Sequence, residues 1–342
     1  MVITGYNNIT AVGHNAITTA SSVRSGISRF SESDEYFDNN GNPVIASPVR
    51  FFGSLKNKED QLELMTKNCF NHMVDHYLNN KTNLFKDIYF LLGFPHEKRP
   101  GLNNEKLGSG IVNGLKDCIQ QYNIENIHFH IVPTGNTSVL HCIENADSIL
   151  KQNPDVLCIV GGIDSLLDYN TLNWFEESHR LLSESFRRNH CFIPGESVAF
   201  MIIESEQKAV SETILAHIKE VKIANEPAGF LSDKPCKGEG LTEVFLSLLS
   251  QYPDNSIETA INDLNGEAFR VKEWMYARMR SIKNKKIDTF QPADNFGNIG
   301  AASGAVFSGI AIEGFSRGWM KPDILISCSD DHGERGAMIL SR

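Results

Sequence analysis

Short apolar runs bounded by turn residues alternate along this chain with longer stretches whose apolar positions recur at the helical spacing. The alternation predicts a layered α/β fold, in which helices cover the faces of a sheet. The apolar runs predicted to be strands are residues 1–6, Ile88–Gly93, Ile127–Val132, Val156–Gly161, Val198–Glu204, Ile214–Ala224, Ser256–Ile261, Ile324–Ser327 and Ala337–Leu340.

Helical periodicity fills most of the sequence between these runs. The segment Asn170–Pro194 departs from it, because it is richer in charged and aromatic residues, and it is predicted to be a surface excursion. A boundary between two halves of the chain is predicted near Glu206–Glu212. The predicted helices are Gln61–Leu78, Ile111–Tyr122, Asn136–Leu150, Leu241–Ser250, Glu267–Ile282 and Ile299–Phe315.

Composition narrows the class of protein. The chain has 342 residues, 41% hydrophobic and 22% charged, with a formal net charge of -10. This excess of acid argues against nucleic acid as a partner, because binding phosphates needs clustered Lys and Arg. No apolar run reaches the roughly 18 residues of a membrane span, and residues 1–5 lack a signal-peptide pattern. Seven cysteines, an odd number, favour reduced thiols in the cytoplasm.

One motif carries most of the chemical information. Pro133-Thr134-Gly135-Asn136-Thr137-Ser138 precedes a helical stretch and then the strand that ends in Gly161-Gly162. In this order the segment resembles the nucleophile region of a β-ketoacyl synthase, a condensing enzyme of the thiolase fold, in which a reactive cysteine begins a buried helix. The resemblance places Asn136 at the cysteine position. Since an amide cannot be acylated as a thiolate can, it implies a chain that lacks the condensing nucleophile.

The resemblance continues in the same order along nearly the whole chain. It implies a thiolase-like five-layer αβαβα sandwich of two similar βαβαβαββ halves, here residues 1–210 and 211–342. The small residues that follow Asn298 then allow the two central helices to approach closely. The further motifs that resemble the family are Val2–Gly5 with Gly13–Asn15 and Gly26-Ile27, Phe192–Phe200, Gly297–Ala305 and Gly336–Leu340.

The two histidines that a decarboxylating ketosynthase uses are also replaced. The first falls on Asn265, or on Leu264 if a gap is placed differently, and the second falls on Asn298 after Gly297. Asparagine can hold a buried hydrogen-bonded cluster, because it both donates and accepts. It cannot shuttle a proton near neutral pH. Asn136, Asn265 and Asn298 are therefore predicted to mark a degenerate catalytic site.

The family's glycine-rich C-terminal loop, which helps to build the oxyanion hole, corresponds here to the charged stretch Ser329–Gly336. Cys328, Asp331 and His332 could form a rebuilt pocket, since thiolases carry a second reactive cysteine in roughly this place. The alternative is a strand-end cysteine followed by a solvated acidic turn. Cys142 is a second candidate for a relocated nucleophile, although it lies well around the helix from Asn136. No spacing typical of a metal site is present, and no cofactor is implied.

Two further patterns bear on surfaces. His128 and His130 share one face of a predicted strand. The matching strand pairs across the two-fold axis of thiolase-fold dimers, so these histidines are predicted at an interface. In a helix that begins near Glu267, Arg270 and Glu273 lie near one face. They are predicted to form surface ion pairs, with a rebuilt site or docking surface as the alternative.

The sequence is compatible with three functions. The first is a ketosynthase-like pseudoenzyme that pairs with an active ketosynthase, as chain-length factors of polyketide and aryl-polyene systems do, in contact with acyl carrier protein. The second is a homodimeric accessory scaffold, similar to thiolase-like proteins encoded beside secretion-system effectors. The third is an active acyltransferase with a relocated nucleophile. Fold alone does not decide among them.

Overall fold

A computed structural model describes residues 1–53, 55, 57–78, 87–120, 122, 124–183, 191–252, 257–282 and 287–342. Ser256, the first residue of one predicted strand, and residues 184–190 of the predicted excursion lie outside the described part. Among the described residues, no helix is long and apolar enough to cross a membrane.

Within these residues the main sheet has ten strands in the order β10-β9-β11-β12-β8-β1-β7-β6-β4-β5. A separate hairpin pairs β2 with β3. The bounds of the strands are β1 Val2–Ile9, β2 Ser31–Phe37, β3 Pro43–Ala46, β4 Asp87–Gly93, β5 Asn126–Val132, β6 Leu157–Ser165, β7 Glu196–Glu204, β8 Ala216–Asn225, β9 Thr259–Asn262, β10 Asp288–Phe290, β11 Ile324–Ser329 and β12 Glu334–Ser341.

Strand order and direction repeat in the two halves of this sheet. From the middle outward, the first half runs β1, β7, β6, β4 and β5, and the second runs β8, β12, β11, β9 and β10. In both halves each of the first three strands is antiparallel to its neighbour, and the last three strands are parallel. The halves meet where Val2 pairs with His217 and Ile3 with Ala216. The division at residue 210 stays a proposal, which this repeat supports.

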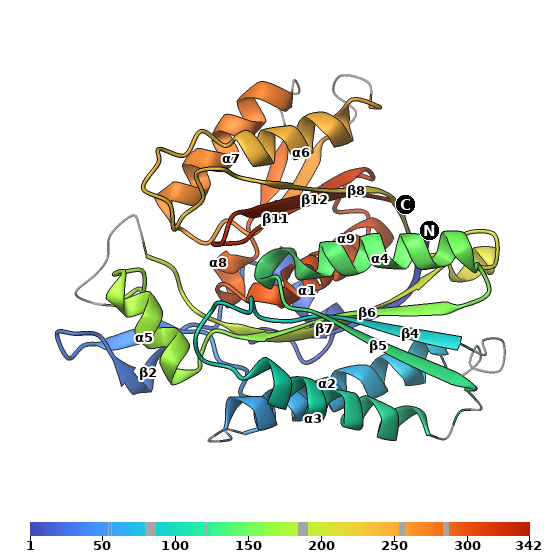
Figure 1. The fold of residues 1–342 in the computed structure, drawn as a ribbon, viewed down its shortest axis with the longest axis horizontal. Coiled ribbons are helices and arrows are strands. Elements are labelled where there is room, and N and C mark those ends of the chain that lie inside the picture. Colours follow the sequence, from blue (N-terminus) through green and yellow to red (C-terminus); the bar gives the residue numbers. More distant parts are fainter. Residues whose placement is uncertain are drawn as a thin grey trace.

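Helices complete a five-layer arrangement (Figure 1). α6 and α7 cover the C-terminal half of the sheet, α2 and α3 cover the N-terminal half, and α4, α9 and α1 lie between the two. The bounds of the helices are α1 Ala16–Arg24, α2 Lys58–Met73 with a π-helical continuation Val74–Leu78, α3 Asn104–Ile119, α4 Ser138–Gln152, α5 Tyr169–Glu177, α6 Glu239–Leu249, α7 Ala268–Ser281, α8 Ala293–Phe296 and α9 Ser303–Ser316. Short 3₁₀ turns precede α4 at Gly135–Thr137 and α9 at Gly300–Ala302.

Small residues let the middle layer pack closely. A Cβ on Gly304 of α9 would lie 3.0 Å from the side chain of Val139 of α4, and one on Gly162 would lie 2.6 Å from the carbonyl oxygen of Ala301. α9 is buried along nearly its whole length. The prediction that the small residues after Asn298 serve close helix approach agrees with these contacts.

One predicted element is wrong. The segment Asn170–Pro194 is not a surface excursion in its described part, because it contains most of α5 and buries Phe175, Arg180 and Phe192. Its charged side chains misled the prediction, since the charge of Arg180 is neutralised inside the protein. The sequence prediction also had no counterpart for β2, β3, β10 and α8, which are short or hydrophilic.

Candidate functional site

Asn136 lies buried in the turn that leads into α4. Its backbone N–H donates to Asp330 Oδ2 at 3.3 Å, and its side-chain Nδ2 donates to Asp263 Oδ2 at 3.0 Å. The preceding Gly135 has φ +64, and a Cβ there would lie 2.1 Å from Asp330 Oδ2. The turn thus needs glycine, and it holds the asparagine as a donor to two carboxylates.

Asp263, at the end of β9, is the first anion of this site. It is buried and accepts a hydrogen bond of 2.7 Å from the backbone N–H of Ser329, and Arg270 Nη1 lies 3.5 Å from the same Oδ2 atom. Burial raises the pKa of the Asp263 carboxyl, although Arg270, the Ser329 N–H and Asn136 act in the opposite direction. A carboxylate here would raise the pKa of any thiol placed at position 136.

Asn265 supports a second carboxylate. Its Nδ2 donates to Glu267 Oε2 at 2.9 Å, and the Glu267 backbone N–H donates to Asn265 Oδ1 at 3.2 Å. The side chain of Asn265 therefore fixes Glu267 at the start of α7 instead of facing a reactant. Its role here is to position a buried anion.

Two arginines neutralise the site. Arg180 donates to Glu267 at 2.6 and 3.0 Å and to Asp331 at 2.8 and 3.2 Å. Arg270 donates to Asp331 Oδ1 at 2.8 Å, to Glu267 Oε2 at 3.3 Å and to the carbonyl oxygen of Ser329 at 2.5 Å. Burial alone would raise the pKa of Asp331, but the two guanidinium groups hold it well below its usual range. We refer to Arg180, Arg270, Asp263, Glu267 and Asp331 as the ion cluster.

The ion cluster corrects the predicted role of α7. Arg270 and Glu273 do not form surface ion pairs, since both side chains are buried, and Glu273 instead accepts from Arg335 Nε at 2.6 Å. Sequence reasoning also missed Arg180, whose guanidinium lies 3.9 Å from the centre of the Phe230 ring. No local signal could have found Arg180, because its partners are more than eighty positions away in the sequence.

Asn298 has a third, separate task. Its Oδ1 accepts from the backbone N–H of Gly300 at 3.0 Å, at the turn that begins α9. The N–H of Ala301 donates to Asp164 at 2.8 Å, and Arg99 holds the same carboxylate at 2.5 and 3.0 Å. The turns before α4 and α9 pack against each other. Asn136 and Asn298 therefore lie in neighbouring segments, but each makes its own hydrogen bonds.

The three residues of the predicted rebuilt pocket take up different environments. Cys328 is fully buried in β11, and burial raises the pKa of its thiol well above the usual value of a cysteine. Asp331 belongs to the ion cluster. His332 stacks on His96 with ring centres 3.7 Å apart, and its Nδ1 lies 3.1 Å from Asp330 Oδ1. A shared reactive pocket of Cys328, Asp331 and His332 stays a prediction.

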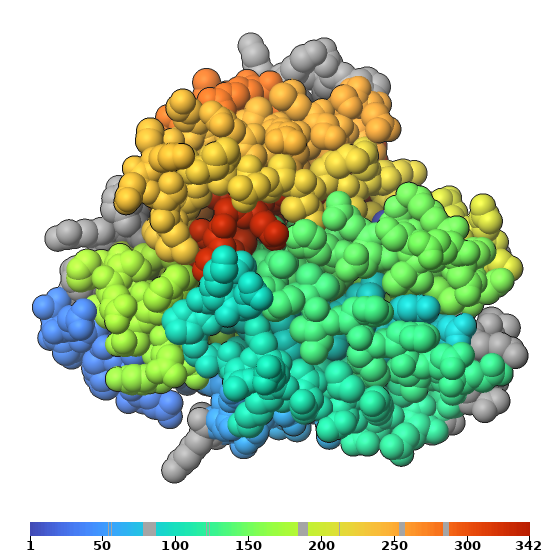
Figure 2. Space-filling model, in the orientation of Figure 1, coloured from blue at the N-terminus to red at the C-terminus, as the bar shows by residue number. Residues whose placement is uncertain are grey.

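His96, Asp330 and His332 place potential metal-ligand atoms within 4.8 Å of one another. They lie where the turn between β11 and β12, red in Figure 2, meets the teal loop after β4. The backbone N–H of Lys98 donates to His96 Nδ1 at 3.1 Å, which leaves the ring proton on Nε2, the nitrogen nearer Asp330. A metal ion would have to replace that proton and separate the stacked rings. The arrangement therefore favours a metal-free site, in which the two stacked imidazole rings lie beside the Asp330 carboxylate.

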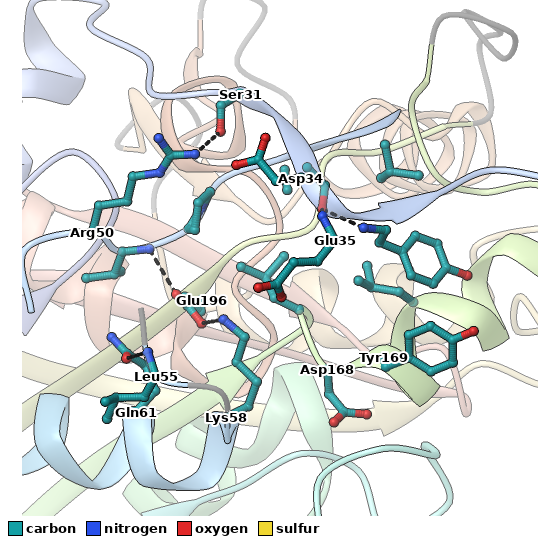
Figure 3. Close-up of a pocket in the computed structure, with 18 of the residues that line it drawn as sticks. Ser31, Asp34, Glu35, Arg50, Leu55, Lys58, Gln61, Asp168, Tyr169 and Glu196 are labelled. Atoms are coloured by element: carbon teal, nitrogen blue, oxygen red, sulfur yellow. Dashed lines mark hydrogen bonds and ion pairs between the residues drawn. The ribbon is translucent and has the colours of Figure 1, made fainter. Parts of the chain in front are cut away.

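A cavity of about 680 Å³ lies apart from these residues, between the β2–β3 hairpin, the start of α2 and the start of α5 (Figure 3). At its base Glu196 accepts from Lys58 Nζ at 3.4 Å and from the Val49 N–H at 2.9 Å. Asn136, Asn265 and Asn298 are not among its lining residues. This cavity therefore does not coincide with the three positions that the resemblance predicts for the condensing site.

Among the described residues, β5 is the edge strand of the N-terminal half of the sheet. It pairs with β4 on one side, and its residues are half-buried or exposed, among them Ile131. His128 and His130 both stack against Tyr89 of β4, with ring centres 4.3 and 6.2 Å apart. The predicted interface at this strand stays a prediction.

Comparisons with known proteins place the fold. The chain matches no protein-family model and no curated protein. Among solved structures it is similar to a type II polyketide ketosynthase in complex with its acyl-carrier protein, with TM-score 0.79, 14% identity and coverage of 99% of this chain and 98% of that one. It is also similar to a ketosynthase in complex with its chain length factor from Xenorhabdus doucetiae, with TM-score 0.74, 13% identity and coverage of 99% and 97%.

A third similar structure is the module 6 ketosynthase of the bacillaene synthase from Bacillus subtilis 168, with TM-score 0.75, 13% identity and coverage of 100% of this chain and 71% of that one. The fold is the thiolase-like fold of ketosynthases. The fold class predicted from the sequence is thus confirmed. At 13–14% identity the likeness concerns the fold and carries no activity over to this chain.

Proposed function

We propose that this protein is a non-catalytic ketosynthase-like subunit that acts through pairing, in the manner of a chain length factor. One observation carries the proposal. At the position that corresponds to the condensing cysteine, the Asn136 amide is hydrogen-bonded to Asp263, whose neighbour Arg270 belongs to a buried ion cluster. This arrangement has no nucleophile, and its titratable groups are engaged with one another.

The alternative of a relocated nucleophile finds little support in the cysteines. Cys142 and Cys328 are fully buried, and burial raises the pKa of both thiols. A thiolate is the reactive form, so raised pKa values at inaccessible sites oppose acyl transfer.

The partner surface that we propose is the β5 edge. An unpaired apolar edge strand invites pairing with another chain, and solved structures of the same fold include a complex of a ketosynthase with its chain length factor. The partner at this edge is either a second copy of this chain or an active ketosynthase, and the sedimentation experiment below distinguishes the two. A cytoplasmic location remains part of the proposal.

Two measurements test it. Intact-protein mass spectrometry after incubation with acyl and malonyl thioesters of coenzyme A and acyl carrier protein should show no adduct and no decarboxylation. A stoichiometric adduct that is abolished by Cys328→Ala or Cys142→Ala would establish the acyltransferase alternative instead.

Sedimentation at micromolar concentration tests the pairing. We expect a homodimer, or a heterodimer when a ketosynthase is co-expressed, and we expect Ile131→Lys to prevent it. Ile17→Lys, at an exposed position of α1, is the matched control that should leave pairing intact. A wild-type protein that stays monomeric both alone and with a ketosynthase would contradict the proposal.

A further inference from the structure

α7 and the residues after it are strongly basic in an otherwise acidic protein. Residues 268–286 hold seven Lys or Arg and one Glu, whereas the whole chain has a formal net charge of -10. Two of these charged groups, Arg270 and Glu273, are buried. Lys272 and Arg280 are exposed on α7, and Lys283, Lys285 and Lys286 follow in the sequence, outside the described residues. Such a concentration of one sign attracts a partner of the opposite sign.

The outer face of α7 also carries an apolar ridge. Val271, Met275 and Met279 are 40%, 41% and 75% exposed. Their spacing of four residues aligns them along one side of the helix. α7 belongs to the outermost layer of the C-terminal half (Figure 1), and against the described residues the three side chains of the ridge stay exposed. Surface hydrophobic residues are normally scattered singly, and a continuous row beside cations is typical of a binding face.

The cations flank this ridge at defined places. Lys272 Nζ and the Arg280 guanidinium each lie over the Tyr276 ring, at 5.7 and 5.5 Å from its centre. Arg280 Nη1 also donates to the carbonyl oxygen of Lys237 at 2.5 Å. These contacts hold two positive charges beside the ridge, both next to the Tyr276 ring.

We propose that the outer face of α7, defined by Val271, Lys272, Met275, Met279 and Arg280, docks an acidic amphipathic helix of a partner protein. The apolar side of that helix packs on the Val271–Met279 ridge, and its carboxylates lie against Lys272 and Arg280. Methionine suits such a contact because its flexible side chain adapts to a partner's shape. This inference does not depend on the loss of condensing chemistry.

The chemistry favours a protein helix over a lipid surface or nucleic acid. A helix that inserts into a bilayer surface presents a wide apolar face with Trp, Phe or Leu, but Trp274 points into the core and the ridge is one side chain wide. Binding a nucleic-acid backbone needs many clustered cations to neutralise phosphates, and the formal net charge of -10 opposes it. A single row of apolar side chains fits the groove of another helix.

The test uses a synthetic fluorescent helix with leucine at every fourth position and glutamate on its flanks. Fluorescence anisotropy with the full chain should show saturable binding that weakens as salt rises. Met275→Ala with Met279→Ala, and separately Lys272→Glu, should each weaken binding about tenfold or more. Circular dichroism checks that each variant is folded.

Matched controls come from other elements. Val210→Ala removes an apolar side chain that is 53% exposed, and Lys219→Glu reverses an exposed charge on β8. Both should bind the peptide as the wild type does. Equal binding by the α7 variants, equal binding of a peptide with lysine in place of glutamate, or binding only to phosphatidylglycerol vesicles or duplex DNA would each overturn the proposal.

Discussion

The side-chain amide of Asn136 and the carboxyl of Asp263 are joined by a hydrogen bond of 3.0 Å, although the residues are 127 positions apart in the sequence. The bond links the turn before α4, in the N-terminal half, to the end of β9, in the C-terminal half. It uses the amide as a donor and the carboxyl as an acceptor. A cysteine would supply neither the shape nor a strong donor at this place.

Placing a cysteine at position 136 should therefore not give condensing activity. In Asn136→Cys the thiol would lie beside Asp263, whose negative charge raises the thiol pKa, and no histidine stands at position 265 or 298. We expect no acyl adduct by intact-protein mass spectrometry and no product from malonyl thioester. Efficient acylation of this variant would show that the site retains hidden catalytic capacity.

Arg180 should be one of the most sensitive positions for stability. Arg180→Met leaves Glu267 and Asp331 facing Arg270 alone, and removal of one partner of a buried ion pair costs about 3–5 kcal/mol. Urea unfolding followed by circular dichroism measures the loss. The contrast is Lys151→Met on the surface of α4, where the pair with Asp147 is exposed and we expect less than about 1 kcal/mol. Similar values for the two variants would contradict the role given to the ion cluster.

Two glycines with nearly the same φ allow the cost of a left-handed backbone to be measured apart from the cost of steric crowding. Gly135 and Gly26 have φ +64 and +66, but an added Cβ at 135 meets Asp330 Oδ2 at 2.1 Å, whereas at 26 it meets nothing within 4 Å. Gly26→Ala should cost about 1–2 kcal/mol for the left-handed conformation alone. Gly135→Ala should cost about 1–3 kcal/mol more because of crowding. The two stability losses are compared from denaturant midpoints, provided that the slope of the unfolding free energy against denaturant is unchanged. Equal losses for the two variants would mean that the turn at Gly135 is less crowded than described.

The pair of His141 and Glu334 should make stability depend on pH. The two lie 2.9 Å apart. Burial alone would lower the pKa of His141, but the hydrogen bond and charge of Glu334, with the charge of Glu144, raise it. Burial alone would raise the pKa of Glu334, but hydrogen bonds from His141 and Thr137 lower it. The contribution of the raised histidine is complete below about pH 6.5 and is lost as pH rises through its folded pKa, and that of Glu334 is lost at acid pH.

The stabilisation by this pair should therefore be greatest in the mildly acidic range. We expect the difference in unfolding free energy between the wild type and His141→Gln to be larger at pH 5.5 than at pH 8.5. A parallel series with His14→Gln, at an exposed position just before α1, provides the control. A difference in unfolding free energy that stays constant with pH would contradict the assignment of an ion pair between His141 and Glu334.

The sequence predicted the layered fold well where burial is continuous. β4 and β6 are apolar along most of their length because helices cover both faces of their half of the sheet. The positions of Asn136, Asn265 and Asn298 came from the resemblance, but their hydrogen bonds could not. Which carboxylate an amide meets depends on contacts such as Asn136 to Asp263, which no local pattern encodes. Arg180 was hidden for the same reason, because hydropathy ranks a buried, neutralised arginine as a surface residue.

The place of β1 in the sheet has a consequence for synthesis on the ribosome. β1 pairs along its length with β7, whose last residue is Glu204, and it also meets β8. At about 5–20 residues per second, translation leaves this fully buried strand without its partner for roughly 10–40 s after it is made. During this interval α1 and α2 can cover part of β1, but its sheet edges stay unpaired, and we expect ribosome-associated chaperones to be needed at that stage more than after release.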